Sequence, residues 1–214
     1  MAECDHTSKC SDKELNQPFS SQQDIALFIV GGPAGCGKST IAKTIARSTH
    51  IPFIEGDDLH SAESRAKMAA GYPLVDDDRW DWLDRLVSRA REVELGSPAA
   101  AMVITCSSLK KSYRDRIRKR VEEFRGQGSK LRAWFLFCKL SQEEAIRRVR
   151  AREGQVIKMG VMAGQFADLQ LPDPDQESRV YVLDVERNIS EVEKDAVDFV
   201  WSCIGSLEYQ SREE

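Results

Sequence analysis

Gly32-Pro-Ala-Gly-Cys-Gly-Lys-Ser39 is a complete match to the phosphate-binding pattern G-x-x-x-x-G-K-[ST]. It follows the apolar run 25–30 and leads into the helix-forming stretch 40–46, which is the strand–loop–helix context that the motif requires. Glycines let backbone N–H groups turn inward around phosphate oxygens, and the N-terminus of the following helix adds the positive end of its dipole. The motif therefore predicts binding of a nucleoside triphosphate.

Two side chains of this loop carry specific chemistry. Lys38 can reach the β- and γ-phosphates, and the Ser39 hydroxyl can bind Mg²⁺. The alternative, a plain glycine turn between a strand and a helix, is disfavoured because both flanks also fit the motif. The predicted nucleotide-binding residues of the loop are Gly32, Pro33, Ala34, Gly35, Cys36, Gly37, Lys38, Ser39 and Thr40.

Composition narrows the class of protein. The 214 residues suit one domain, and a net charge of −4 gives no reason to expect a nucleic-acid partner. No apolar run approaches the ~20 residues of a membrane helix. The six cysteines include no C-x-x-C pair, which favours a reducing, cytosolic compartment. We expect disordered tails at 1–23 and 207–214 around a kinase-sized domain at 24–206.

Apolar runs alternate with amphipathic stretches, which predicts an α/β fold with a parallel sheet covered on both faces by helices. The expected strands are 25–30, 52–54, 101–106, 131–138 and 180–185. The expected helices are 38–48, 61–70, 78–94, 110–125, 141–153 and 190–204. The segment 154–175, with glycines and a Pro-Asp-Pro end, breaks this rhythm and is either a closing lid or a long surface loop.

The acidic residues have an informative position. The expected strand 101–106 ends without Asp or Glu, whereas Ile54-Glu-Gly-Asp-Asp58 follows the strand before it. Since parallel strands end at one edge of a sheet, Asp57 would face the same crevice as the phosphate loop. It could serve Mg²⁺, an acceptor hydroxyl or both, and helix capping is the alternative. This layout favours transfer to a small acceptor over a mechanical or switching ATPase.

Three further blocks carry a family resemblance. They begin Gly56-Asp-Asp-Leu-His60, Gly71-Tyr-Pro-Leu-Val75 and Cys106-Ser-Ser-Leu-Lys110, and continue to Met68, Leu83 and Arg118. Together they resemble the gluconokinase family of small phosphate-loop kinases, which shows G-D-x-L-H, G-x-P-L-x-D-x-D-R and C-S-A-L-K-x-x-Y-R-D in this order. The resemblance covers about 25–204, and Arg79-Trp-Asp-Trp82 is similar to the fungal branch.

The resemblance implies transfer of the γ-phosphoryl group of ATP to the 6-hydroxyl of D-gluconate, with Mg²⁺, in the pentose phosphate route. It also implies a nucleoside-monophosphate-kinase-like three-layer fold with strand order 2-3-1-4-5 and a lid, and a homodimer as a candidate assembly. By the motif match, Asp57 would orient or deprotonate the acceptor hydroxyl. Arg148 and Arg152 would belong to the nucleotide side, and Arg152 would act on the phosphates during catalysis.

Gluconate carries a carboxylate and five hydroxyls, so its pocket requires a cation and hydrogen-bonding groups. A solvated helix face is the alternative for each cation taken alone. Within the matching blocks the predicted substrate-binding residues are Asp57, His60, Lys67, Asp78, Arg79, Lys110 and Arg114.

The chain departs from the family pattern mainly around the expected lid. Gln155 and Val156 replace a His-Phe pair, Ser64 replaces an Asn, and Leu171 replaces an acid, whereas Gln165-Phe166 keeps the family's Gln-Phe pair. Two alternatives therefore stay open. One is a related kinase for another sugar acid or polyol, and the other is an ATP-binding regulator that has lost turnover.

Overall fold

Residues 24–151 and 159–210 are described by the structure, a computed structural model. The predicted N-terminal tail and Arg152 lie outside these residues. Among the described residues, no helix combines the length and the apolar character needed to cross a membrane.

Five parallel strands form one sheet in the order β2-β3-β1-β4-β5, which confirms the predicted fold class. Each expected strand is present to within about one residue at either end. The apolar runs locate the strands well because β1, β3 and most of β4 are buried on both faces and have few polar positions. The strands are β1 (Ile25–Gly31), β2 (Phe53–Ile54), β3 (Ala101–Thr105), β4 (Leu131–Lys139) and β5 (Val180–Asp184).

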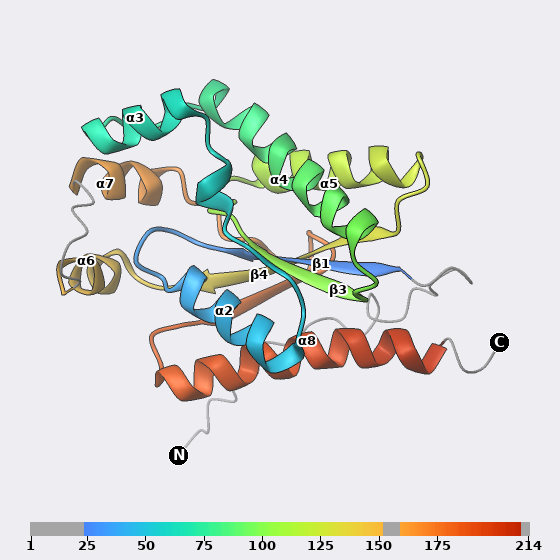
Figure 1. The fold of residues 1–214 in the computed structure, drawn as a ribbon. Coiled ribbons are helices and arrows are strands. Elements are labelled where there is room, and N and C mark those ends of the chain that lie inside the picture. The colour runs from blue at the N-terminus through green and yellow to red at the C-terminus, as the bar shows by residue number, and fades with distance from the viewer. Residues whose placement is uncertain (1–23, 152–158, 211–214) are drawn as a thin grey trace, which may run out of the picture.

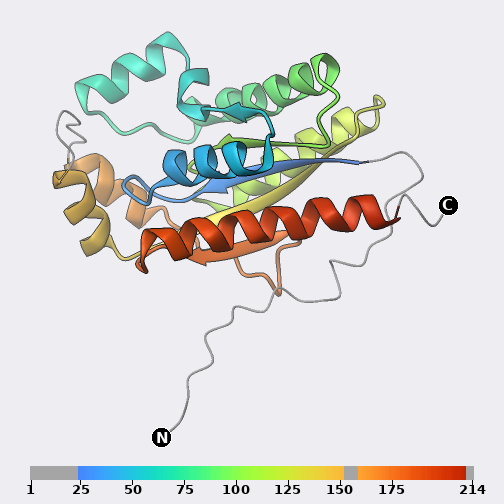
Figure 2. The same ribbon diagram turned by 60° about the horizontal axis from the view of Figure 1, so that its bottom comes forward.

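Helices cover both faces of the sheet, giving three layers (Figure 1). The helices α4 (Asp77–Gly96) and α5 (Lys111–Arg125) pack on one face, around a core that includes Trp82 and Ile104. The helices α2 (Lys38–Thr49) and α8 (Ile189–Gln210) lie along the other face, as the rotated view of Figure 2 shows. Their core includes Phe28 and Ile41. The two cores fix β1, and with it the start of the phosphate loop, in the middle of the sheet.

The remaining helices lie near the carboxyl ends of the strands. They are the 3₁₀ turn Gly56–Leu59, α3 (Ala62–Ala70), α6 (Gln142–Arg150) and α7 (Met159–Ala167). The helix α7 was not expected, because glycines at 160 and 164 lower helix propensity. It is held by packing, since Met162 is fully buried in the core beside α2. The helix α8 continues to Gln210, so the boundary predicted for a C-terminal tail at 207 lies inside it.

Candidate active site

The phosphate loop takes the shape that its glycines permit. Gly32, Gly35 and Gly37 have φ angles of 130°, 82° and 94°, which residues with a side chain rarely adopt. The loop runs from the end of β1 into the first turn of α2, where Lys38 and Ser39 lie. Lys38 Nζ donates to the Pro33 carbonyl at 3.0 Å and so points back over the loop. The arrangement is suited to holding a phosphate chain against a helix N-terminus.

A cavity of about 330 Å³ adjoins this loop. It is lined by Gly35, Gly37 and Thr40 on one side and by Arg148 of α6 on the other. Arg148 is held in place by Glu144 at 2.7 Å and by the Val185 carbonyl at 2.6 Å. The cavity thus joins the predicted nucleotide residues of the loop to one of the two predicted nucleotide-side arginines. Its volume and position suit the nucleoside part of a nucleotide.

The 3₁₀ turn places Asp57 near the same edge of the sheet. Its first residue, Gly56, lies so close to β3 that a Cβ there would be 1.9 Å from the Thr105 carbonyl oxygen. The Gly56 N–H donates to Thr105 Oγ1 at 2.9 Å, and Trp82 Nε1 donates to the Gly56 carbonyl at 2.8 Å. Asp57 follows with an exposed carboxylate. The turn is therefore rigid, while its acid is accessible.

Electrostatics connect this acid to the phosphate loop. Burial and, to a smaller extent, the Asp57 carboxylate raise the pKa of the Cys106 thiol, at the end of β3, to about 12. The charges of Arg79 and Lys38 oppose this shift. The Cys106 N–H donates to the Val30 carbonyl at 3.1 Å, and the Gly32 N–H donates to the Ser107 carbonyl at 3.0 Å. The end of β3 therefore lies between the phosphate loop, which carries Lys38, and the 3₁₀ turn, which carries Asp57.

Arg79 and His60 have buried polar atoms without a hydrogen-bond partner among the described residues, namely Arg79 Nε and His60 Nδ1. His60 is 5% exposed and stacks on Trp82 with ring centroids 4.2 Å apart. Burial and then the charges of Arg79, Arg85 and Arg65 lower the pKa of His60 to about 4, so its ring is neutral at pH 7. Buried polar atoms are usually bonded, so these two atoms are candidates for contacts with a bound ligand.

Two of the predicted substrate cations already have carboxylate partners. Lys67 Nζ lies 2.6 Å from Asp78 Oδ1, and Lys110 Nζ lies 2.7 Å from Asp76 Oδ1. The Lys110 ammonium also contacts Asp168 at 3.3 Å. Their charges are largely balanced before any substrate binds. The predicted residue Asp78 is likewise engaged with Lys67, which lowers its pKa.

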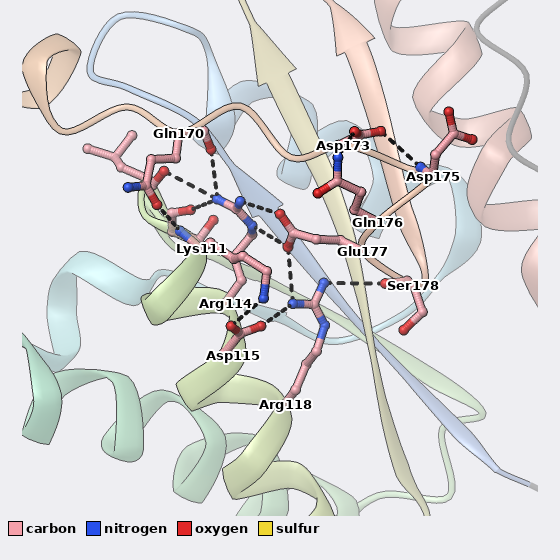
Figure 3. A network of polar contacts seen from close by, with 12 residues as sticks. Lys111, Arg114, Asp115, Arg118, Gln170, Asp173, Asp175, Gln176, Glu177 and Ser178 are labelled. Carbon is pink, nitrogen blue, oxygen red and sulfur yellow. Dashed lines mark hydrogen bonds and ion pairs between the residues drawn. The ribbon is translucent and has the colours of Figure 1, made fainter.

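Arg114 does not occupy the place predicted for it. Its side chain is fully buried, and it donates from Nε and Nη2 to the Glu177 carboxylate at 2.8 and 2.5 Å (Figure 3). Its Nη1 donates to the carbonyls of Ser108, Leu109 and Gln170. The guanidinium therefore connects α5 to the segment before β5 and has a structural role in place of the predicted substrate contact.

Asp76 is not among the residues predicted from sequence, although it pairs with the predicted residue Lys110. It accepts from Lys110 and from the Tyr113 hydroxyl, and Lys110, Tyr113 and Arg79 together keep its pKa low. A signal was available, because Asp76 is the first acid of the Asp-Asp-Asp-Arg79 run in a block that matches the family.

Comparison with known proteins agrees with this geometry. Residues 27–171 match the family described as AAA domain. A probable gluconokinase of Saccharomyces cerevisiae is 35% identical over 91% of this chain and 100% of its own length. The chain belongs to the gluconokinase family. This confirms the predicted resemblance, and the yeast relative accords with its fungal-type variant.

Other members of the gluconokinase family support the same assignment. The thermoresistant gluconokinase of Escherichia coli is 32% identical over 85% of this chain and 97% of its own length. The crystal structure of a gluconokinase from Sinorhizobium meliloti superimposes with a TM-score of 0.70, at 33% identity, over 89% of this chain and 99% of that one. The protein is a gluconokinase-like, ATP-dependent kinase.

Proposed function

We propose that the protein transfers the γ-phosphoryl group of ATP to the 6-hydroxyl of D-gluconate, giving 6-phosphogluconate and ADP. The observation that carries the proposal is Arg79, a cation that is 9% exposed, has an unpartnered Nε and lies 5.8 Å from the centre of the Tyr113 ring. Lys67, Lys110 and Arg114 are each engaged by a carboxylate. Arg79 is therefore the group that we assign to the carboxylate of gluconate.

The other acceptor contacts follow from the same site. Nδ1 of the neutral His60 ring can accept a hydrogen bond from a sugar hydroxyl or, when it carries the proton, donate one to it. Asp57 is exposed, and its 3₁₀ turn lies on the other side of the end of β3 from the phosphate loop. In our proposal it orients the 6-hydroxyl and accepts its proton as the new P–O bond forms and the bond to ADP breaks. Lys38 stabilises the negative charge that develops on the transferred group.

Mg²⁺ would be held by the Ser39 hydroxyl and by Asp57. The described residues contain no group of three or more His, Cys, Asp or Glu side chains that could hold a metal ion. A site with few protein ligands suits Mg²⁺, which keeps several waters and binds substrate phosphates. When bound, the ion would neutralise charge on the β- and γ-phosphates.

Arg79→Met tests the acceptor assignment. We expect kcat/KM for gluconate to fall about 10- to 100-fold, because a hydrogen-bonded charge pair contributes about 1.5–3 kcal/mol. Glucitol has a hydroxymethyl group in place of the carboxylate. Its kcat/KM as an acceptor, or its inhibition constant if it acts as a competitive inhibitor, should therefore change less than about threefold. Arg89→Met, on the exposed side of the same helix, is the control. An equal loss for both compounds, or no loss for gluconate, would count against the assignment.

Two alternatives have specific outcomes in the same assays. A kinase for another sugar acid or polyol would turn over that acceptor in preference to gluconate. A regulator without turnover would bind ATP and release no ADP with any acceptor. The predicted nucleotide role of Arg152, the lid at 154–175, the homodimer and the cytosolic location remain predictions.

A further inference from the structure

One peptide of the phosphate loop, between Pro33 and Ala34, is hydrogen-bonded at both ends. Its carbonyl accepts from Lys38 Nζ at 3.0 Å and from the Cys36 N–H at 3.3 Å. Its N–H, on Ala34, donates to the side-chain oxygen Oε1 of Gln165 at 2.7 Å. Gln165 belongs to α7 and is separated from Ala34 by 131 residues. The chain thus uses a distant side chain to bind an amide of its own phosphate loop.

This contact restrains the orientation of the peptide. A peptide unit bonded through both its N–H and its C=O cannot rotate without breaking both sets of bonds. Without Gln165, the Ala34 N–H would have to find water, and the carbonyl that holds Lys38 could turn away. Gln165 therefore acts on Lys38 through the peptide between them.

The helix that carries Gln165 is itself anchored near the acceptor side. Asp168, three residues further along, pairs with Lys110 at 3.3 Å. The Gln170 N–H then donates to the Leu109 carbonyl at 3.0 Å, and Gln170 Oε1 accepts from the Lys111 N–H at 2.8 Å. These bonds fix the C-terminal end of α7 against the loop between β3 and α5. Gln165 thus reaches the phosphate loop from a supported position.

We propose that Gln165 is a positioning residue for Lys38: its carboxamide holds the Pro33–Ala34 peptide so that the peptide carbonyl keeps the ammonium group over the phosphate site. The proposal rests on the kinase assignment and not on the identity of the acceptor. It gives a role to Gln165, the first residue of the Gln165-Phe166 pair that the chain shares with the family pattern.

A double-mutant cycle tests the proposal through binding of a non-hydrolysable ATP analogue. Gln165→Met keeps the length of the side chain and removes the acceptor. We expect it to weaken binding about tenfold, the effect of roughly one lost hydrogen bond and a mobile Lys38. In a Lys38→Met background the same change should alter binding less than about twofold, because its effect passes through Lys38. Gln176→Met, an exposed glutamine, is the matched control.

The results distinguish a failure of the proposed role of Gln165 from a failure of the kinase assignment. Additive effects of the two substitutions, or unchanged binding in Gln165→Met, would overturn the proposal. A second cycle with Gln165→Ala lacks the methionine side chain. A defect that appears with Met but not with Ala is therefore caused by the packing of Met. Gln165 is only half-buried, and the thermal midpoints of both variants should stay within a few degrees of the wild type. Failure of the wild type to bind the analogue would contradict the kinase assignment instead.

Discussion

Lys38→Ala is expected to lower kcat by about 10²- to 10³-fold, the usual effect of removing one group that stabilises transition-state charge. Lys38 lies in the first turn of α2, and its ammonium group rests on the loop carbonyl of Pro33 at 3.0 Å. Phosphoryl transfer depends on positioning and charge stabilisation more than on covalent chemistry of the protein. Steady-state ADP release with gluconate as acceptor measures the loss.

The control for this variant lies on the same helix. Lys43 is exposed on α2, so Lys43→Ala removes an equal charge at a distance from the loop. We expect its kcat to stay within about twofold of the wild type and both variants to unfold near the wild-type temperature. A near-normal rate in Lys38→Ala would mean that Gly32–Ser39 is not the catalytic phosphate loop.

Arg114→Met is expected to destabilise the fold by about 3–5 kcal/mol, because it leaves the Glu177 carboxylate buried without its main partner. Glu177 is 6% exposed and also bonds Arg118, which offsets only part of the loss. Urea unfolding measures the change in free energy. Lys111→Met, which breaks an exposed pair with Asp115 on the same helix, should cost less than about 1 kcal/mol.

Kinetics distinguish the structural role of Arg114 from the substrate contact predicted from sequence. At a temperature where Arg114→Met is fully folded, KM for gluconate should stay within about twofold of the wild-type value. A large rise in KM with little loss of stability would restore Arg114 to the acceptor site.

The sequence was sufficient for the sheet and for the phosphate loop, because both depend on local patterns. Buried parallel strands are near-continuous apolar runs, and the loop needs glycines, Lys38 and Ser39 at fixed spacing. The helix α7 could not be predicted in this way. Its glycines argue against a helix, and tertiary contacts hold it, among them the buried side chain of Met162 and the hydrogen bond from Ala34 to Gln165.

The site was predicted less completely, because charge pairing depends on tertiary structure. Lys67, Lys110 and Arg114 had the residue type expected of substrate cations. Their partners Asp78, Asp76 and Glu177 lie 11, 34 and 63 residues away along the chain. No local pattern reports which cation is neutralised at such separations. The contact of Gln165 with Ala34, across 131 residues, is of the same kind.

Identification of the product shows whether the protein phosphorylates the 6-hydroxyl of D-gluconate. The protein would be incubated with Mg-ATP and D-gluconate, and the products would be followed by phosphorus NMR. We expect a new phosphate monoester whose phosphorus is coupled to the protons on C6 of gluconate, formed in the same amount as ADP. ATP binding without any new ester, or an ester formed only with a different acceptor, would contradict this expectation.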